Sequence, residues 1–215
     1  LSSVLNQNYP NMEIIISDNC STDNTQDILT NVASSDSRIK YFRQSKNTGI
    51  FANFDFVLKM SIGEYFMWFA DDDRLEPDII QKYVDFLLEN RGCSLVSGQI
   101  QYWDSDSATY IEKDFNIKQR APMTRVLNYY GNVVYGGMFH GMMRRALLNE
   151  IEIRNTLAAD WHIVAQMAYM GRLENLDTIG YHKQFGGSSI DFKTYVKNIG
   201  APSINGYFPF FFIGL

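Results

Sequence analysis

The chain has 215 residues, of which 46% are hydrophobic, 14% aromatic and 20% charged. This composition excludes disordered, collagen-like and low-complexity chains. A chain of this length fits one domain, or one domain with a short appendage, and can bury about 70% of its unfolded surface. Nineteen Lys and Arg against 24 Asp and Glu give a formal net charge of −5, so no basic surface for binding nucleic acid is expected.

The cysteines and the two ends of the chain indicate in which cellular compartment the protein is expected. Cys20 and Cys93 are too few for a disulfide framework and lack zinc-ligand spacing, which favours reduced thiols in a cytosolic protein. Residues 1–9 do not have the pattern of a signal peptide. The uncharged stretch 198–215 is interrupted by prolines and glycines, so a spanning helix is not predicted there. Its apolar end, 207–213, either packs on the domain or contacts a membrane.

The first half alternates between short β-branched or aromatic runs and helical patterns, which is typical of a parallel sheet covered by helices. The run Met12–Ser17 (MEIIIS) is apolar enough for a strand buried on both faces. In chain order, we expect a strand at Met12–Ser17, a helix from Ser21 or Thr22 to about Ala33, a strand at Arg38–Arg43, a helix at Gly49–Met60, a strand at Glu64–Ala70, a helix at Asp78–Glu89 after Pro77, and a strand at Ser94–Ile100.

The second half is less regular. We expect hairpin or loop at Gln101–Lys118, a helix at Pro122–Tyr130, a glycine-containing strand at Met138–Arg144, a helix at Ala159–Met170, and one or two strands within Arg172–Gln184. The fold class predicted is α/β, with an open, mostly parallel sheet and helices on both faces. Such a domain has a strand before its first helix, whereas Leu1–Gln7 resembles the tail of a helix. We therefore expect that one strand and the start of a helix are missing from this sequence.

Three consecutive aspartates, Asp71, Asp72 and Asp73, follow the apolar run Tyr65–Ala70 and so emerge at the carboxyl end of a strand. Open α/β sheets bind ligands at that end. Adjacent carboxylates repel one another unless a cation offsets their charge, and Mg²⁺ or Mn²⁺ suits such oxygen ligands. The alternative is structural, with these residues capping the next helix or forming the turn Asp73–Glu76. For Asp73 alone, the turn is the preferred interpretation.

Asp18 follows the strand Met12–Ser17 in the same way. Its carboxylate can accept hydrogen bonds from a nucleobase or a sugar hydroxyl. Taken alone, it would more simply form an Asx-turn into the next helix. The ligand-binding interpretation gains weight because two strand ends in this half carry acids.

Five segments together point to a known family. They are Ser3–Pro10 (SVLNQNYP), Glu13–Asp23 (EIIISDNCSTD), Asn47–Gly49 (NTG), Gly63–Tyr65 (GEY), and Ala70–Asp73 (ADDD) followed by Pro77. In order and spacing they resemble the inverting family 2 glycosyltransferases of the GT-A (Rossmann-like) fold. The resemblance is strong over Leu1–Gly98, weaker over Gly136–Ser189, and slight between them.

On the donor side, the resemblance implies that Asp18 contacts the nucleotide base, that Asp71 lies near the ribose, and that Asp72 holds the divalent metal bridging the diphosphate. An acid often stands in the family where this chain has Ala70, so which of Asp71 and Asp72 touches the metal is open. A cation is needed on physical grounds as well, because an acidic protein and a diphosphate repel each other. The metal would also stabilise charge on the departing diphosphate.

Three further positions match recurrent ones in the family, namely Asn47, Gly49 and Asn53. For these we expect structural roles, with Asn47 as a helix cap and Gly49 as tolerant backbone.

On the acceptor side, Asp160 precedes Trp161 and resembles the Asp of the family's acid-Asp-Trp signature, which is the catalytic base. The position before it, commonly acidic, is Ala159 here. Asp160 can also cap the helix that follows, and a base held at a helix end is well oriented. His140 either lines the acceptor pocket or is a structural residue of its strand.

Two other histidines are not assigned to the chemistry. His162 is expected on the helix surface or beside the site. His182 stands where relatives often have the arginine of an Arg-x-His arrangement, and Gln184 stands near the histidine's place. We therefore do not expect His182 to bind the metal.

The leading hypothesis is an inverting, metal-dependent glycosyltransferase using Mg²⁺ or Mn²⁺. It would move a sugar from a nucleotide-sugar donor to the hydroxyl of a glycan or lipid-linked acceptor in bacterial polysaccharide or cell-surface glycan synthesis. Residues 1–198 would form one catalytic domain, with a nucleotide-sugar-binding half at 1–98, an acceptor-binding half at 99–198 and an apolar tail at 199–215. Its expected location is the cytoplasm, with peripheral contact at the inner face of the plasma membrane.

The main alternative is a catalytically inactive GT-A-like domain that binds a nucleotide sugar or a protein partner. It is favoured by the departures from the family pattern at Ala70, Ala159 and His182. A nucleotidyltransferase is disfavoured because no basic Gly-rich phosphate loop is present. A dehydrogenase is disfavoured because no Gly-x-Gly-x-x-Gly turn follows a strand.

Overall fold

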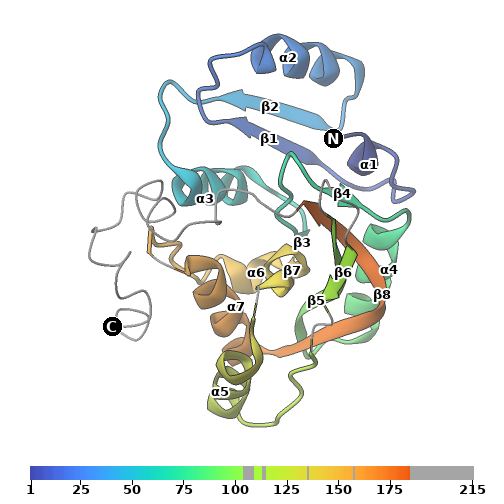
Figure 1. Ribbon diagram of the computed structural model, residues 1–215, viewed down its shortest axis with the longest axis vertical. Helices are drawn as coiled ribbons and strands as arrows, with labels where there is room; N and C mark the ends of the chain where they lie inside the picture. Colours follow the sequence, from blue (N-terminus) through green and yellow to red (C-terminus); the bar gives the residue numbers. More distant parts are fainter. Residues whose placement is uncertain (104–108, 113–114, 135, 157, 185–215) are drawn as a thin grey trace. The chain divides into compact units, whose positions relative to one another are not determined.

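The computed structural model describes residues 1–103, 109–112, 115–134, 136–156 and 158–184 (Figure 1). The predicted apolar tail, 199–215, lies outside these residues. The chain divides into two compact units. Unit 1 comprises the described parts of residues 1–10, 64–152 and 160–190, and unit 2 comprises those of residues 11–63 and 153–159.

Unit 2 contains a two-stranded parallel sheet. Its elements are β1 (Ile14–Asp18), α2 (Thr25–Ser35), β2 (Ile39–Arg43) and α3 (Ile50–Met60). In the parallel register, Ile14 pairs with Ile39 at one end and Asp18 pairs with Arg43 at the other. The carboxyl ends of both strands therefore present charged side chains next to each other. Four of the five β1 residues are partly exposed, so this strand is not buried on both faces as expected.

Helix α2 begins later than predicted. Its first residue is Thr25, and no side chain caps it. The preceding residues form a loop in which Cys20 adopts a left-handed conformation with φ of 69°. The Asp23 carboxylate accepts the Thr25 N–H at 3.0 Å. Local side-chain hydrogen bonds thus compete with the helix over Ser21–Asp23.

Unit 1 is built on a mixed sheet with strand order β3-β7-β5-β8-β4, with β6 beside β5. The strands are β3 (Tyr65–Phe66), β4 (Arg74–Leu75), β5 (Cys93–Trp103), β6 (Thr109–Glu112), β7 (Met142–Arg144) and β8 (Arg172–Gln184). Its helices are α1 (Ser2–Leu5), α4 (Ile79–Glu89), α5 (Pro122–Asn132), the 3₁₀ helix η1 (Gly137–His140), α6 (Arg145–Leu148) and α7 (Ala159–Met170).

The α/β class is confirmed, but the pairing corrects the expectation of a mostly parallel sheet. Within unit 1, β5 and β8 are parallel, whereas β3–β7, β4–β8, β5–β6 and β5–β7 are antiparallel. Each antiparallel pair joins a strand of the first half to one of the second half, where hairpins and short strands replace the helix-covered crossovers that parallel pairing requires.

The core of unit 1 lies between α4, α7 and the central strands. Helix α4 buries residues at helical spacing, namely Ile79, Tyr83, Val84 and Leu87, and it packs against β5. Other fully buried side chains of this core are Leu95, Ile100, Met143, Leu148, Ile163 and Met167. Both cysteines are free, and burial raises the pKa of the Cys93 thiol to about 11, so this thiol stays neutral.

Two predicted strands are shorter than expected. The strand predicted at Glu64–Ala70 pairs only over Tyr65–Phe66, because its neighbour β7 has three residues. Beyond it, aromatic packing replaces strand pairing, with the Trp68 ring stacked on Phe139 at 4.7 Å. In the strand predicted at Met138–Arg144, the first residues form η1 instead. Gly136 starts this turn with φ of 76°, and its carbonyl accepts the Phe139 N–H at 3.0 Å.

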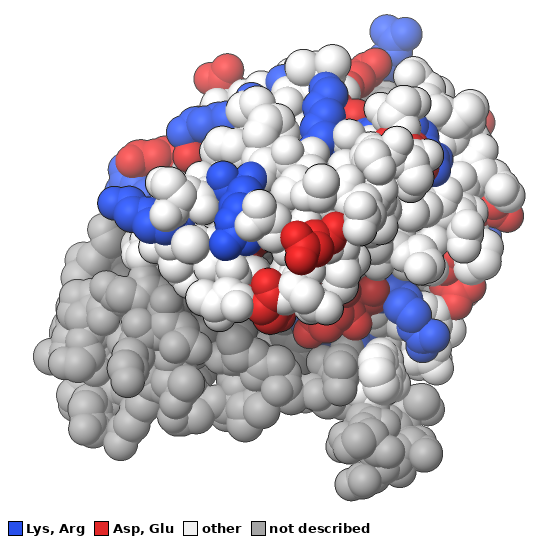
Figure 2. Space-filling model, turned by 90° about the horizontal axis from the view of Figure 1, so that it is seen from above, with Lys and Arg blue, Asp and Glu red and all other residues white. Residues whose placement is uncertain are grey.

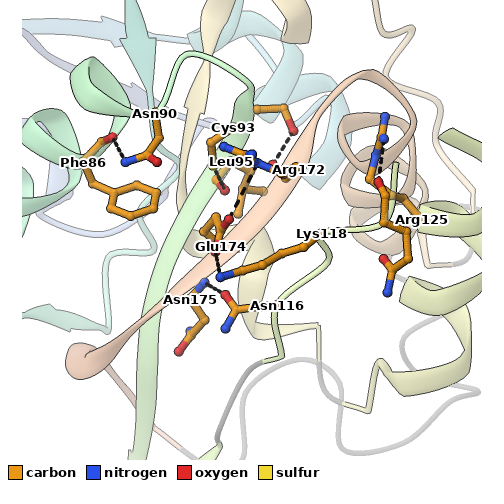
Figure 3. A network of polar contacts seen from close by, with 12 residues as sticks. Phe86, Asn90, Cys93, Leu95, Asn116, Lys118, Arg125, Arg172, Glu174 and Asn175 are labelled. Carbon is orange, nitrogen blue, oxygen red and sulfur yellow. Dashed lines mark hydrogen bonds and ion pairs between the residues drawn. The ribbon is translucent and has the colours of Figure 1, made fainter. Parts of the chain in front are cut away.

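A polar network fixes the start of β8 (Figure 3). Glu174 pairs with Lys118 at 2.8 Å and with Arg172 at 3.7 Å. The Asn116 side chain accepts the Asn175 N–H at 2.7 Å. These contacts attach residues 116–118 to β8, as does the backbone pairing of Ile117 with Leu173.

Arg125 of α5, labelled in Figure 3, is buried, and its guanidinium donates to four carbonyls. The acceptors are those of Ala168 at 2.5 Å, Tyr169 at 2.7 Å, Arg120 at 2.9 Å and Gln119 at 3.0 Å. Two of them belong to the last turn of α7, whose carbonyls have no partner within the helix. Arg125 therefore ties the end of α7 to the start of α5.

Acidic and basic side chains both occur on the face of the molecule shown in Figure 2. Surface ion pairs of unit 2 include Lys40 with Glu13 at 2.8 Å and Lys59 with Asp55 at 2.5 Å. Pairs of this kind contribute little to stability because solvent screens them. Across the part of the chain that the structure describes, no helix combines the length and apolar character needed to cross a membrane.

Candidate active site

Asp18 lies at the carboxyl end of β1 with its side chain fully buried. One carboxylate oxygen, Oδ1, accepts the Ser21 N–H at 2.7 Å, which is the Asx-turn considered from the sequence. The other, Oδ2, accepts from Arg43 Nη1 at 2.6 Å and from the Tyr41 hydroxyl at 3.1 Å. Arg43 also donates to the Ser21 carbonyl at 2.8 Å. The side chain is thus held in one orientation by the end of β2.

Asp18 remains ionised despite its burial. Burial alone would raise the pKa of this carboxyl, but hydrogen bonds from Ser21 and Tyr41 and the charge of Arg43 outweigh it, and the pKa is lowered. A fixed, ionised carboxylate at a strand end is a hydrogen-bond acceptor for the N–H groups of a nucleobase.

The residues after Asp18 are tied to the loop before α3. The Asn19 amide donates to Asn47 Oδ1 at 3.0 Å and to the Gly49 carbonyl at 3.2 Å, and its oxygen accepts the Thr48 N–H at 2.9 Å. Asn47 also accepts the Gly49 N–H at 2.9 Å. Asn47 therefore braces this loop, and the N-cap of α3 is Gly49, with φ of 86°. These contacts are structural, as expected, although Asn47 is not itself the cap.

Asn53 has a comparable role. Its side chain accepts from the Ser17 hydroxyl at 2.6 Å and donates to the Ser17 carbonyl at 3.1 Å. The first turn of α3 is therefore attached to the end of β1.

In unit 1, the three aspartates form a turn between β3 and β4. Asp71 and Asp72 are exposed, whereas Asp73 is buried, with 3% of its surface exposed. Tyr181 of β8 holds this turn. Its hydroxyl donates to Asp73 Oδ2 at 2.8 Å and accepts the Ala70 N–H at 3.3 Å. Asp73 is thus the structural member of the three, in agreement with the sequence interpretation.

The pairing of β4 with β8 brings a second set of side chains to this turn. Arg74 pairs with His182 and Leu75 with Tyr181 in an antiparallel register, so the next position places Asp73 opposite Lys183. Lys183 Nζ lies 3.9 Å from Asp73 Oδ2. His182 turns the other way and pairs through Nε2 with the Glu76 carboxylate, so that side chain already has a partner away from Asp73.

His140, at the end of η1, lies beside Tyr181 and Lys183. Its ring stacks on Tyr181 with centroids 4.7 Å apart, and its Nε2 lies 2.9 Å from Lys183 Nζ. The pKa of His140 is well below 6.5, first because of burial and then because of the Lys183 charge. His140 is therefore neutral, and Nε2 accepts a hydrogen bond from the Lys183 ammonium.

Asp160 occupies the first turn of α7. Burial raises the pKa of its carboxyl, although the Trp161 N–H and the Lys183 charge act in the opposite direction. The neighbouring Gly136 is needed in this space. A Cβ added there would lie 2.7 Å from Trp161 Nε1 and 3.3 Å from Asp160 Oδ2. The backbone of Gly136 therefore passes directly beside the candidate base.

Ala159, which departs from the family pattern, is itself buried. It packs with Phe51, Phe54 and Ile153 in an apolar cluster of unit 2. A carboxylate at this position would be desolvated among aromatic rings, which explains in physical terms why alanine stands here.

The carboxylates of Asp71 and Asp72 suit a metal ion whose other ligands come from a substrate. Among the described residues, no hydrogen bond or ion pair occupies the carboxylates of Asp71 and Asp72, and no group of three or more His, Cys, Asp or Glu side chains could hold a metal by itself. Mg²⁺ is commonly bound by one or two carboxylates, with substrate phosphates and water completing its shell. The donor set therefore suits a cation that arrives with a diphosphate.

Two residues of this site were not found from the sequence, Tyr181 and Lys183. Both contact Asp73, and both lie more than 100 positions from it along the chain. The period of two along β8 is the signal that could have found them, because it puts residues 181 and 183 on one face.

Solved structures share this fold. S. aureus TarS 1–349 in complex with UDP-GlcNAc has a TM-score of 0.66 and 17% identity, over 97% of this chain and 68% of TarS. The mannosyltransferase PcManGT from Pyrobaculum calidifontis, in complex with GDP-Man and Mn²⁺, has a TM-score of 0.63 and 14% identity, over 92% of this chain and 56% of that one. The fold is that of the GT-A glycosyltransferases.

Residues 1–151 match the model of glycosyl transferase family 2, and the chain belongs to this family. The resemblance inferred from the five sequence segments is thereby confirmed, and the chain carries a glycosyltransferase domain.

Relatives with named activities cover part of the chain. The putative teichuronic acid biosynthesis glycosyltransferase TuaG of Bacillus subtilis is 36% identical over 92 residues, which are 43% of this chain and 36% of TuaG. The UDP-Glc:alpha-D-GlcNAc-diphosphoundecaprenol beta-1,3-glucosyltransferase WfaP of Escherichia coli is 31% identical over 138 residues, which are 64% of this chain and 48% of WfaP. The chain spans 28–36% of the length of TuaG and two further relatives.

Proposed function

We propose that this chain is the catalytic part of an inverting, metal-dependent glycosyltransferase that moves a sugar from a nucleotide-sugar donor to an acceptor hydroxyl. One observation of unit 1 carries the proposal. The exposed carboxylates of Asp71 and Asp72 share a turn with Asp73, and Lys183, which lies against Asp73, also acts electrostatically on the half-buried Asp160. A candidate metal-binding turn and a candidate base thus have a common neighbour.

Asp160 is proposed as the catalytic base. Its role is to take the proton from the acceptor hydroxyl while that oxygen attacks the anomeric carbon in a single in-line displacement, which inverts the configuration. A raised pKa suits this task, because a carboxylate of higher pKa is the stronger base. Its place in the first turn of a helix keeps the side chain oriented.

Asp72 is proposed to hold the divalent metal, and Asp71 to lie near the ribose. When bound, Mg²⁺ or Mn²⁺ would supply Lewis-acid stabilisation of the negative charge on the departing diphosphate. The PcManGT complex with Mn²⁺ supports the use of a divalent cation in this fold.

In unit 2, Asp18 is proposed to bind the nucleotide base. Its support is the ionised, immobilised carboxylate, whose partners Tyr41 and Arg43 fix it from β2. The UDP-GlcNAc complex of TarS and the UDP-Glc named for WfaP make a UDP-sugar the first donor to test.

His140 is proposed to face the acceptor, and its neutral state limits it to hydrogen bonding and packing. The name of WfaP describes a sugar on diphosphoundecaprenol as acceptor, which supports a lipid-linked or glycan acceptor here. Bacterial cell-surface glycan synthesis at the inner face of the plasma membrane is the corresponding setting, with peripheral membrane contact and no nucleic-acid partner.

The test uses the full chain with UDP-Glc or UDP-GlcNAc, Mn²⁺ or Mg²⁺, and GlcNAc-diphosphoundecaprenol as acceptor. Release of UDP and formation of the disaccharide lipid are measured. Asp160→Asn should lower turnover by roughly 10²- to 10⁴-fold while UDP affinity is kept. Asp72→Asn should remove the metal dependence of UDP binding. The exposed carboxylate of Asp27 gives the matched control Asp27→Asn.

Failure of UDP and GDP to bind in the presence of Mn²⁺ would refute the proposal. Equal turnover by the Asp160→Asn variant would refute the assignment of the base. Intact binding with no transfer to any acceptor would favour the inactive GT-A-like domain.

A further inference from the structure

Lys183 stands in the candidate site without a role in the chemistry proposed so far. Its side chain leaves β8 opposite Asp73 and is one-third exposed, at 33%. It brings a positive charge to a turn that otherwise presents Asp71, Asp72 and Asp73. A lysine in this place could serve only to neutralise the charge of Asp73.

The distances argue against a purely structural ion pair. Lys183 Nζ lies 3.9 Å from Asp73 Oδ2, which is too long for a hydrogen bond. The Asp73 oxygen is already taken by the Tyr181 hydroxyl at 2.8 Å. Attraction therefore places Lys183 near Asp73, but its N–H groups are not used there.

The ammonium of Lys183 is fixed by the hydrogen bond that it donates to His140. Its neutral Nε2 accepts from Lys183 at 2.9 Å, and the imidazole is held in turn by stacking on Tyr181. An ammonium has three N–H donors and no acceptor. Among the described residues, His140 is the hydrogen-bond partner of Lys183, so further donors remain for a ligand.

We propose that Lys183 binds the diphosphate of the nucleotide donor, as a fixed cation of the protein that His140 and Tyr181 position. This inference rests on the proposed function and adds the residue that contacts the leaving group. Phosphate oxygens are anionic acceptors and form strong, charge-assisted hydrogen bonds with an ammonium. Partial exposure lets a ligand reach Lys183.

The proposal separates Lys183 from the metal. A metal held by Asp72 depends on added Mn²⁺, whereas the contribution of Lys183 is present in its absence. Lys183 should also distinguish ligands by their phosphate groups, since it is assigned to the diphosphate and not to the base or the ribose.

The experiment titrates UDP, UMP and uridine calorimetrically into the full chain, with Mn²⁺ and with EDTA. Lys183→Met removes the charge and keeps the length of the side chain, Lys183→Arg keeps the charge, and Lys59→Met is the control at an exposed lysine of α3. The expected loss for Lys183→Met is roughly 10- to 100-fold in UDP affinity under both conditions. Uridine affinity should not change, and Lys183→Arg should retain more UDP affinity than Lys183→Met.

A second measurement needs no variant. Reductive methylation of wild-type protein, followed by mass spectrometry, should show Lys183 protected by UDP and not by uridine. Unchanged UDP affinity in Lys183→Met, equal losses for UDP and uridine, or methylation of Lys183 that UDP does not slow would each overturn the inference while leaving the proposed function in place. Absence of UDP and GDP binding by the wild-type chain would overturn both.

Discussion

Removing one hydroxyl group from Tyr181 tests how the aspartate turn is held. Tyr181→Phe keeps the ring that stacks on His140 and deletes the bonds to Asp73 Oδ2, at 2.8 Å, and to the Ala70 N–H, at 3.3 Å. A hydrogen bond to a charged group contributes about 1.5–3 kcal/mol, and the longer backbone bond contributes less. The free energy of unfolding should therefore fall by about 2–3 kcal/mol.

Fluorescence gives a direct assay, because all three tryptophans, Trp68, Trp103 and Trp161, belong to unit 1. Urea unfolding followed by tryptophan emission thus reports the unit that contains Tyr181. At about 2–4 °C per kcal/mol for a chain of this size, the melting temperature should drop by about 4–12 °C. Tyr169 is exposed on α7 and provides the control Tyr169→Phe, which should change neither value.

The same substitution should weaken Mn²⁺-dependent UDP binding, because Asp71 and Asp72 lie in the turn that Tyr181 supports. The loss should be smaller than that of Asp72→Asn, which removes a proposed ligand itself. An unfolding free energy within about 0.5 kcal/mol of the wild type would refute this account of the turn. Lower stability with unchanged UDP affinity would show that the turn keeps its shape without the hydroxyl.

Three further predictions concern other parts of the molecule. Arg125→Met should destabilise unit 1 by about 3–5 kcal/mol in the same urea assay, because four carbonyls lose their donor, and a loss under 1 kcal/mol would contradict its role at the end of α7. Gly136→Ala should lower both melting temperature and turnover, since φ of 76° and contacts at 2.7 and 3.3 Å oppose a Cβ, whereas stabilisation would mean that the segment can move aside. The lowered pKa of Asp18 means that its contribution to stability is present above the unfolded pKa, about 3.9, and is lost as pH falls through the lower folded value. In the Asp18→Asn variant, the free energy of unfolding in urea should therefore fall less steeply as the pH decreases below 4. The same pH dependence as in the wild type would contradict the assignment.

Much of the fold follows from local sequence patterns. The start of helix α4 was predicted to within one residue, because its buried positions recur at helical spacing. The predicted strand at Met138–Arg144 was wrong in its first half because Gly136, with φ of 76°, permits a 3₁₀ turn, which alternation of apolar residues does not reveal. The mixed sheet was missed for a related reason, since pairing direction depends on which strands meet and not on the composition of each strand.

In the candidate site, too, some residues could be predicted from local sequence and others could not. Asp18 and Asp160 could be placed at a strand end and a helix start from the sequence, because those positions follow directly from the elements that carry them. The strand end predicted before Asp71 was wrong, because β3 ends at Phe66 and Asp71 lies in the turn that follows. The partners of the aspartates could not be predicted. Arg43 reaches Asp18 through the β1–β2 register, and Tyr181 reaches Asp73 through the β4–β8 register. Contacts between distant strands are a property of the assembled sheet.

The alternation of side chains along β8 has a practical consequence for redesign. Tyr181 and Lys183 contact the aspartate turn, whereas His182 between them pairs with Glu76. Mutagenesis aimed at altering how the protein handles phosphorylated donors should therefore target positions 181 and 183. Randomising position 182 would instead change the contact of His182 with Glu76, and libraries that vary all three positions together would mix the two effects.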